Sequence, residues 1–287
     1  MLSNDFILKD RIEKIRSVIT EYGEYNFYIS FSGGKDSCVI SKLVDIAVPH
    51  NRIPRVYCNT GIEYKLIVDF VEKIKSNDNR FEIIKPNKNI KETLDIYGYP
   101  FKSKEHSEYV DRYQHMGESS KTYQRYMFPD ETRKRYGCPK CLRYQFTHDF
   151  NIKISRKCCE KLKKEPFKIY KKLNKKKYTI TGMRTAEGGS RINLGCIQGT
   201  KFNPLIVVSD EWEEWFIKQY DVEICDIYKE PYNFKRTGCK GCPYNLNLQK
   251  DLDTLEKYFP GERKQCEYIW KPVYDEYRRL GYRLRKE

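Results

Sequence analysis

The stretch ISFSGGKDSC, residues 29–38, joins an apolar run to a turn of serine and glycine and then to a helical pattern. Two adjacent glycines, Gly33 and Gly34, allow the backbone to approach a ligand closely. The helix expected to start near Asp36 points its free amide groups and the positive end of its dipole at the same place. Lys35 adds a full positive charge. The pattern therefore predicts a phosphate-binding loop between a strand and a helix.

Apolar patterns on both sides of this loop predict alternating strands and helices. Helices are expected over residues 4–22, 36–48 and 63–76, and strands over residues 26–31, 55–59, 81–85 and 178–184. Strands that alternate with helices at short spacing favour a parallel sheet covered on both faces. We therefore expect a doubly wound α/β domain, with a nucleotide at the carboxyl ends of the strands.

The alternation is interrupted in the middle of the chain. We expect residues 1–200 to form the nucleotide-binding α/β domain, with a cysteine-rich, basic and partly helical insert at about residues 100–177. Residues 201–287 are expected to form a mainly helical C-terminal part that contains a CxxC motif. Near its start, Asp210 and Glu213 have the spacing of a capping box at the beginning of a helix.

The charge of the chain indicates an anionic partner. The 287 residues include 55 Lys and Arg against 40 Asp and Glu, a net charge of +15. Such an excess attracts polyanions such as DNA or tRNA, although a lysine-rich solvated surface gives the same count. No run of about 18 apolar residues is present, so no membrane crossing is expected. The beginning of the chain lacks a signal-peptide core, and we expect a cytoplasmic location.

The loop itself departs from two common phosphate-binding motifs, because it matches neither G-x-x-x-x-G-K-[ST] nor G-x-G-x-x-G. The string SGGKDS instead resembles the pyrophosphate loop of the adenine nucleotide alpha-hydrolases. VYCNTGIEYK at residues 56–65 and GMRTAEGGSR at residues 182–191 resemble landmarks of the phosphoadenosine phosphosulfate (PAPS) and adenylyl sulfate reductase-like family. The resemblance extends from about residue 25 to residue 245 and lies near the DNA phosphorothioation sulfurtransferases.

This resemblance implies a set of site residues. ATP with Mg²⁺ would bind in the loop, with Lys35 holding the pyrophosphate. Arg184 and Arg191 would contact phosphate or sulfate as catalytic residues, and Glu187 would orient them. The full nucleotide-binding set implied by the resemblance is Ser32, Gly33, Gly34, Lys35, Asp36, Ser37, Thr60, Gly61, Glu63, Gly182, Arg184, Glu187 and Arg191.

Eleven cysteines in a reducing compartment favour metal or redox chemistry over disulfides. Four thiolates can hold a [4Fe-4S] cluster. The adjacent cysteines at 158 and 159, together with the CxxC motif at residues 239–242, resemble the pattern of the iron–sulfur adenylyl sulfate reductases. This resemblance implies the cluster ligands Cys158, Cys159, Cys239 and Cys242. Two CxxC pairs also permit a structural zinc site made by Cys138, Cys141, Cys239 and Cys242. Paired CxxC motifs resemble the tRNA 2-thiocytidine enzymes too, but their Gly-His-His-x-Asp-Asp segment is absent from this sequence.

Cys266 leaves three interpretations open. It lies near the position of the catalytic cysteine of the sulfonucleotide reductases, but the Glu-Cys-Gly-Leu-His tail of those enzymes is absent. Cys266 is therefore a candidate catalytic thiol, a reserve cluster ligand in place of Cys158, or a residue of the core.

The residues and the resemblance together are compatible with three functions. The leading hypothesis is an ATP-cleaving sulfurtransferase that modifies a nucleic acid or nucleotide, supplied by a cysteine desulfurase or a thiol reductant. The first alternative is a thiol-dependent sulfonucleotide reductase that releases sulfite. The second is a nucleotide-binding regulator without turnover.

Overall fold

The structure is a computed structural model, which describes residues 3–132, 137–188 and 191–286. Contacts within the chain divide it into two compact units. Unit 1 comprises Met1–Asn59, Glu63–Lys85 and Pro166–Thr237, and unit 2 comprises Thr60–Ile62, Pro86–Glu165 and Gly238–Glu287. The middle segment and the end of the chain thus share one unit, whereas the sequence order suggested a boundary near residue 200.

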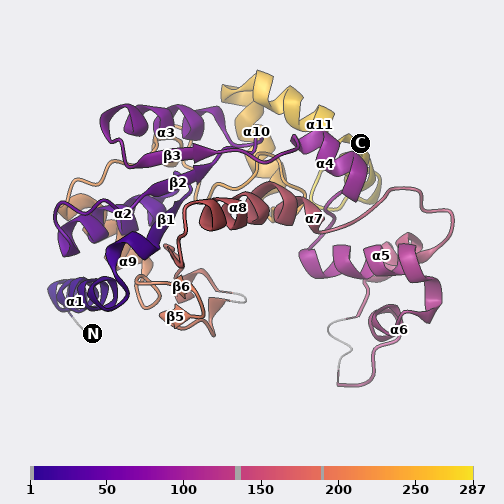
Figure 1. Cartoon of the computed structure of the whole chain (residues 1–287). Coiled ribbons are helices and arrows are strands. Elements are labelled where there is room, and N and C mark those ends of the chain that lie inside the picture. Colours follow the sequence, from indigo (N-terminus) through magenta and orange to yellow (C-terminus); the bar gives the residue numbers. More distant parts are fainter. Residues whose placement is uncertain (1–2, 133–136, 189–190, 287) are drawn as a thin grey trace. The chain divides into compact units, whose positions relative to one another are not determined.

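Unit 1 contains a six-stranded sheet with the order β3-β2-β1-β4-β6-β5 (Figure 1). All neighbouring strands are parallel except β5 and β6, which are antiparallel. The strands are β1 (Phe27–Phe31), β2 (Arg55–Cys58), β3 (Phe81–Ile84), β4 (Tyr178–Ile180), β5 (Ile197–Gln198) and β6 (Lys201–Phe202). The predicted α/β fold is confirmed, and β4 is shorter than the 178–184 strand that the sequence suggested.

Helices pack on this sheet through the apolar positions of the sequence pattern. Those with residues in unit 1 are α1 (Asn4–Tyr22), α2 (Lys35–Ala47), α3 (Lys65–Asn77), α8 (Glu165–Leu173) and α9 (Asp210–Gln219). Tyr28 and Val56 on one face of the sheet pack against Tyr170 of α8. Since side chains alternate along a strand, Phe31 of β1 points to the opposite face, where its ring meets Phe81.

Helix α9 begins differently from the sequence prediction. The N-cap is Ser209, whose hydroxyl accepts a hydrogen bond from the Trp212 amide. The predicted capping box of Asp210 and Glu213 is therefore wrong. A serine directly before the helix satisfies the free amide, and both carboxylates are left to pair with a side chain elsewhere in unit 1.

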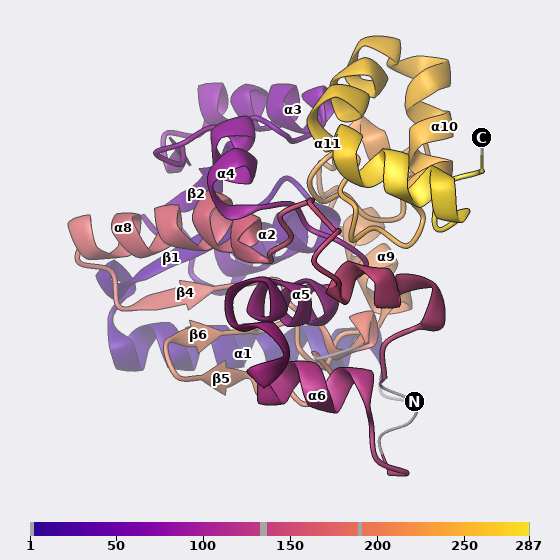
Figure 2. The ribbon, with the colours of Figure 1, turned by 90° about the vertical axis from the view of Figure 1, so that its right-hand side faces the viewer.

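Unit 2 is helical and contains short irregular turns (Figure 2). Its helices are α4 (Ile90–Tyr97), α5 (Lys104–Met116), α6 (Lys121–Met127), α7 (Lys157–Cys159), α10 (Leu248–Tyr258) and α11 (Pro260–Leu280). A π-helical turn, Glu160–Lys164, follows α7. Within the described ranges, none of the helices combines the length and apolar character that a membrane crossing requires.

Candidate functional site

The predicted phosphate loop lies between β1 and α2. Gly33 has a φ of +72°, and a Cβ at this position would lie 2.8 Å from Cγ2 of Ile67, so only glycine fits. Gly34 is the N-cap of α2 and provides no side-chain cap. The first amides of α2, at Lys35 and Asp36, therefore lack the intrahelical acceptors of later turns. The loop presents an uncapped helix N-terminus, as an anion site requires.

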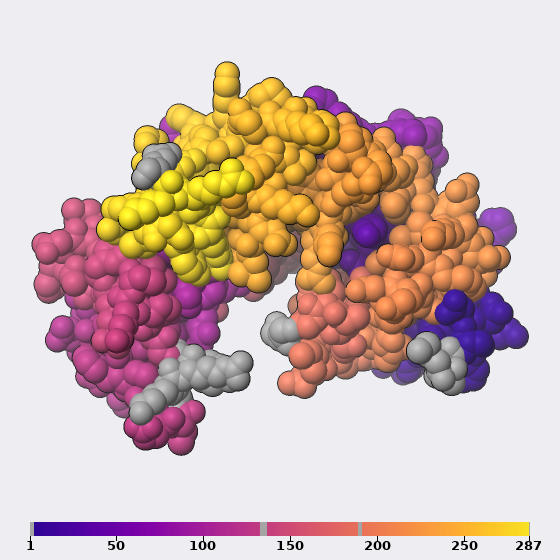
Figure 3. Space-filling model, turned by 180° about the vertical axis from the view of Figure 1, so that it is seen from behind, coloured from indigo at the N-terminus to yellow at the C-terminus, as the bar shows by residue number. Residues whose placement is uncertain are grey.

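A cavity of about 810 Å³ opens at this loop. The strand order reverses at β1, whose neighbours are β2 and β4, and such switch points bind ligands in open α/β sheets. Residues from the N-terminal part of the chain are visible at the bottom of a hollow in the orange surface of Figure 3. The lining comprises Ser30, Ser32, Gly34, Lys35, Asp36, Ser37, Thr181, Gly182, Met183, Arg184, Glu187, Arg191, Asp210, Glu213, Glu214, Tyr228, Lys235, Arg236 and Thr237.

Gly182 closes the floor of the cavity against the loop helix. A Cβ at Gly182 would lie 2.6 Å from the carbonyl oxygen of Asp36. Any larger residue would push the segment after β4 away from the first turn of α2. The glycine that the family resemblance singled out is thus required by a close backbone approach.

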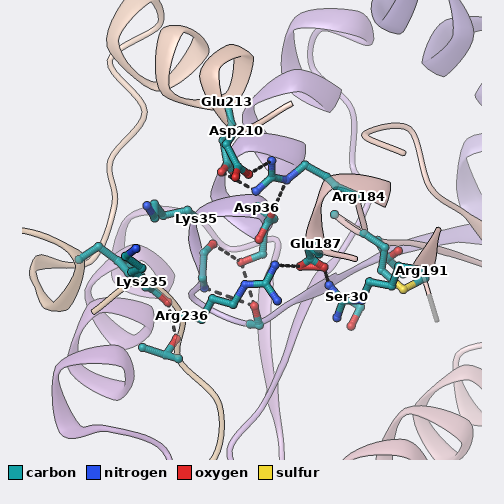
Figure 4. A pocket seen from close by; sticks show the side chains of 18 of the residues that line it. Ser30, Lys35, Asp36, Arg184, Glu187, Arg191, Asp210, Glu213, Lys235 and Arg236 are labelled. Atoms are coloured by element: carbon teal, nitrogen blue, oxygen red, sulfur yellow. Dashed lines mark hydrogen bonds and ion pairs between the residues drawn. The ribbon is translucent and has the colours of Figure 1, made fainter. Parts of the chain in front are cut away.

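Arg184 is held by three carboxylates (Figure 4). Its Nε donates to Asp36 at 2.5 Å, Nη1 to Asp210 at 2.7 Å and Nη2 to Glu213 at 2.9 Å. The Arg184 side chain is 5% exposed. Because each nitrogen of the guanidinium already donates to a carboxylate, Arg184 ties the loop helix α2 to α9. This pairing favours a positioning role over the direct phosphate contact that the sequence suggested.

Glu213 is a carboxyl group of the cavity with a strongly shifted pKa. Burial, followed by the nearby Asp36 carboxylate, raises the pKa of Glu213 to about 7, although Arg184 acts in the opposite direction. Its Oε1 atom is buried and has no hydrogen-bond partner. The cavity wall therefore contains a carboxyl group that binds a proton near neutral pH.

A second ion-pair group lies at Glu187. This carboxylate, 8% exposed, pairs with Arg191 and also lies 3.7 Å from Arg236. Glu187 thus orients one of the two predicted arginines, Arg191, while Arg184 pairs elsewhere. Arg236 was missed by sequence reasoning. Its signal was the basic pair Lys235-Arg236, which comes just before the CxxC motif.

The predicted nucleotide-binding residues divide by location. Most of them line the cavity, and Gly33 packs beneath the loop against α3. Thr60 and Gly61 belong to unit 2, whereas Glu63 belongs to unit 1 and is 9% exposed. None of these three is among the residues that line the cavity.

The four predicted cluster ligands all belong to unit 2, and their thiols influence one another. The pKa of Cys159 is lowered to about 6, because Cys158 is hydrogen-bonded to it and three lysines, Lys104, Lys163 and Lys164, lie around it. The same hydrogen bond and burial raise the pKa of Cys158, and Cys242 and Cys239 act in the same direction. Segments 80 residues apart in sequence therefore bring their thiols into one neighbourhood.

These thiols have the chemistry of an iron–sulfur ligand set, but not the spacing of a formed metal site. Among the residues that the structure describes, no three His, Cys, Asp or Glu side chains are grouped closely enough to hold a metal ion. The [4Fe-4S] cluster, like the alternative zinc site, therefore stays a prediction.

The other cysteines of unit 2 differ in exposure. Cys266 is 0% exposed, and burial raises the pKa of its thiol to about 12. It packs under Gly241, where a Cβ would meet its Sγ at 2.8 Å. Both features favour the core interpretation of Cys266 over a nucleophilic thiolate. Cys138 is buried, whereas Cys141 is exposed.

Comparisons with known proteins agree with the resemblance. Residues 26–130 match the family model described as "Phosphoadenosine phosphosulfate reductase domain". An uncharacterized protein of Methanocaldococcus jannaschii is 28% identical over 262 residues, which cover 84% of this chain and 49% of that protein. The chain thus spans about half the length of this curated relative.

Two solved structures are similar at a low level. The phosphoadenylyl-sulfate (PAPS) reductase from Candida auris has 15% identity and a TM-score of 0.46, covering 83% of this chain and 96% of that chain. The U34-tRNA thiolase NcsA from Methanococcus maripaludis, solved with its [4Fe-4S] cluster, has 15% identity and a TM-score of 0.42, covering 94% and 80%. Similarity at this level identifies neither a shared activity nor a shared cofactor. The family match of the sequence does more, and it confirms the resemblance to the PAPS reductase-like family over residues 26–130, which include the phosphate loop.

Proposed function

We propose that the chain binds ATP in the loop cavity, cleaves it at the α-phosphate and uses the activated group in sulfur transfer to a nucleic acid or nucleotide. The observation that supports this proposal is the uncapped N-terminus of α2, with Lys35 beside it, opening into a cavity at the switch point of the sheet. Backbone amides and a lysine at such a place bind phosphate groups without further ligands.

The chemistry follows from where charge develops. An oxygen of the acceptor attacks the α-phosphorus, the bond to the bridging oxygen of the β-phosphate breaks, and pyrophosphate leaves, bound to Mg²⁺. Lys35 and the loop amides stabilise the negative charge of this leaving group. The terminal sulfur of a persulfide, supplied by a cysteine desulfurase, then displaces AMP from the acceptor. A thiol reductant cleaves the resulting S–S bond, which leaves the sulfur on the acceptor and the donor in a disulfide with the reductant.

Arg184 acts in this proposal through the elements that it joins. Asp36 lies in the first turn of α2, whereas Asp210 and Glu213 lie in α9. By pairing with all three, Arg184 fixes the direction of the helix whose amides face the phosphates. Arg191, which pairs with Glu187 and is more exposed than Arg184, contacts phosphate in this proposal.

In this proposal a [4Fe-4S] cluster would be held by Cys158, Cys159, Cys239 and Cys242, and it would bind or position sulfur. A reducing cytoplasmic location accompanies the proposal, because free thiols persist there. A low-pKa thiol at Cys159 suits this role, since thiolates and not thiols bind metals.

The alternative is thiol-dependent reduction of a sulfonucleotide, and the family match over residues 26–130 favours it. The experiment is to incubate the anaerobically purified chain with ATP labelled at the γ-phosphate, and separately with adenylyl sulfate. Pyrophosphate that depends on a nucleic-acid acceptor supports the sulfurtransferase. Sulfite without pyrophosphate supports the reductase, and nucleotide binding with neither product supports a regulator.

A matched pair of variants controls this experiment. Lys35→Ala removes the loop cation and is expected to abolish either product. Lys201→Ala removes an exposed lysine of β6 that lies outside the cavity, and its activity is expected to equal that of the wild type.

A further inference from the structure

The cations of the cavity are neutralised unequally. Arg184 is paired with three carboxylates, and Arg191 and Arg236 share Glu187. Within the described part of the chain, no carboxylate lies at ion-pair distance from Lys35 or Lys235, although both line the cavity. Lys35 and Lys235 are thus cations of the cavity that no described carboxylate neutralises, and Figure 4 shows both on one side of the cavity.

Tyr228 holds the segment that carries Lys235 beside the phosphate loop. Its hydroxyl is hydrogen-bonded to the Thr237 hydroxyl, and the same oxygen would lie 3.5 Å from a Cβ built on Gly34. The Nζ of Lys35 lies 5.7 Å from the centre of the Tyr228 ring. One side chain therefore contacts the loop, its lysine and the Lys235–Thr237 segment, so that this segment faces the N-terminus of α2.

Arg236 can contact an anion without leaving a buried charge unpaired. Glu187 is 8% exposed, and a carboxylate so buried would be destabilising if it had no cation beside it. Because Arg191 also pairs with Glu187, Arg236, whose side chain is 64% exposed, can turn toward a ligand while Arg191 stays in place. The second cation of the segment is therefore available when a ligand enters.

We propose that Lys235 and Arg236 form a second anion-binding subsite, and that the cavity selects a polyphosphate long enough to reach from the loop amides to Lys235. This inference rests on the proposed function and names the ligand class for its cavity. A single phosphate or sulfate engages the loop alone, whereas a pyrophosphate group engages both subsites. Arg184 is more deeply buried than Lys235 and Arg236. It is not part of the subsite, because each nitrogen of its guanidinium already donates to a carboxylate.

The test is a titration calorimetry series with ATP, inorganic pyrophosphate, AMP and inorganic phosphate. For Lys235→Ala, we expect about tenfold weaker binding of ATP and pyrophosphate, the loss typical of one charge-assisted contact. Binding of AMP and phosphate is expected to change by less than about twofold. Lys235→Arg should retain the affinity for pyrophosphate, and Lys201→Ala is the matched control. Lys235 is exposed, so circular dichroism should show unchanged folding.

The outcomes separate this inference from the proposed function. Wild-type affinity for pyrophosphate in Lys235→Ala would overturn the second subsite while leaving ATP binding in place. Equal losses for AMP, phosphate and pyrophosphate would also overturn it, because Lys235 would then contact the loop-bound anion. A wild-type chain that binds neither ATP nor pyrophosphate would overturn the proposed function itself.

Discussion

The loop cavity of unit 1 differs in its chemistry from the thiol site of unit 2, which consists of Cys158, Cys159, Cys239 and Cys242. The cavity presents backbone amides and a lysine at the end of a parallel strand, where the sheet and its helices fix their positions. The thiol site depends on side chains from α7 and from the turn before α10. A backbone site is complete once the fold forms, whereas thiolates reach their final spacing when they bind a metal. The two sites should therefore respond differently to mutation.

The largest effect is expected for Arg184→Ala in unit 1. The substitution leaves Asp36, Asp210 and Glu213 without their common cation, and removing one partner of a buried ion pair costs about 3–5 kcal/mol. Urea unfolding should show this loss of stability, together with loss of ATP binding. Arg191→Ala, at a half-buried position, is the control and should cost no more than about 1 kcal/mol. Equal losses of stability in the two variants would contradict the tie between α2 and α9, whereas ATP binding is expected to weaken in both.

Two glycines offer a direct comparison of the sites. A Cβ at Gly182 would lie 2.6 Å from the Asp36 carbonyl, and one at Gly241, whose φ is +62°, would lie 2.8 Å from Sγ of Cys266. Overpacking of this kind costs about 1–3 kcal/mol. Gly182→Ala should weaken ATP binding and leave the iron content unchanged, whereas Gly241→Ala should do the reverse.

Gly238→Ala is the control for this pair, since nothing lies within 4 Å of its Cβ position. Calorimetry with ATP and iron analysis after anaerobic reconstitution provide the two measurements. If Gly182→Ala and Gly241→Ala each lose both ATP binding and iron, the cavity and the thiol site are not independent.

A smaller effect is expected in the pH dependence of stability. The pKa of Glu213 is about 7 in the folded chain against an ordinary 4.5, so the folded form binds an extra proton between these values. Stability should therefore fall as pH rises from 4.5 to 7 and level off above 7. Glu213→Gln should remove a difference on the order of 2 kcal/mol between pH 5 and pH 8.

Urea unfolding at the two pH values tests this prediction. Glu13→Gln, which changes an exposed carboxylate of α1, should keep the wild-type dependence. The same slope in Glu213→Gln as in the wild type would assign the titration to another group.

The smallest effect is expected for Cys266→Ala. Removing one buried sulfur atom should cost about 1 kcal/mol and leave the iron content unchanged, because Cys266 packs in the core. Cys242→Ala, by contrast, should lose iron. Loss of iron in Cys266→Ala would restore the reserve-ligand interpretation.

The sequence predicted regular elements and local motifs better than side-chain partners. The strand, the glycine turn and α2 follow from neighbouring residues, and the structure has them within one or two positions of the prediction. The ion-pair partners of Arg184 do not follow from neighbouring residues, because Asp36 and Glu213 are far from it in sequence and only the packed sheet brings them together. Asp210 and Glu213 were misassigned for the same reason, since a capping box is a local pattern and the ion pair is not.

Lys235 illustrates a second limit. A basic pair before a CxxC motif has no periodicity of its own, so its residue types alone do not distinguish it from a solvated surface. Its place in the cavity depends on Tyr228, which holds the segment beside the loop.

The exposure of Cys141 has a practical consequence. It is the one exposed cysteine among the eleven, all of which lie within the described residues. A bulky maleimide reagent therefore reaches this position more easily than Cys158, which is buried, or Cys159, Cys239 and Cys242, which are half-buried. Labelling studies of the chain should begin from a Cys141→Ser background, in which later modification reports on the remaining thiols.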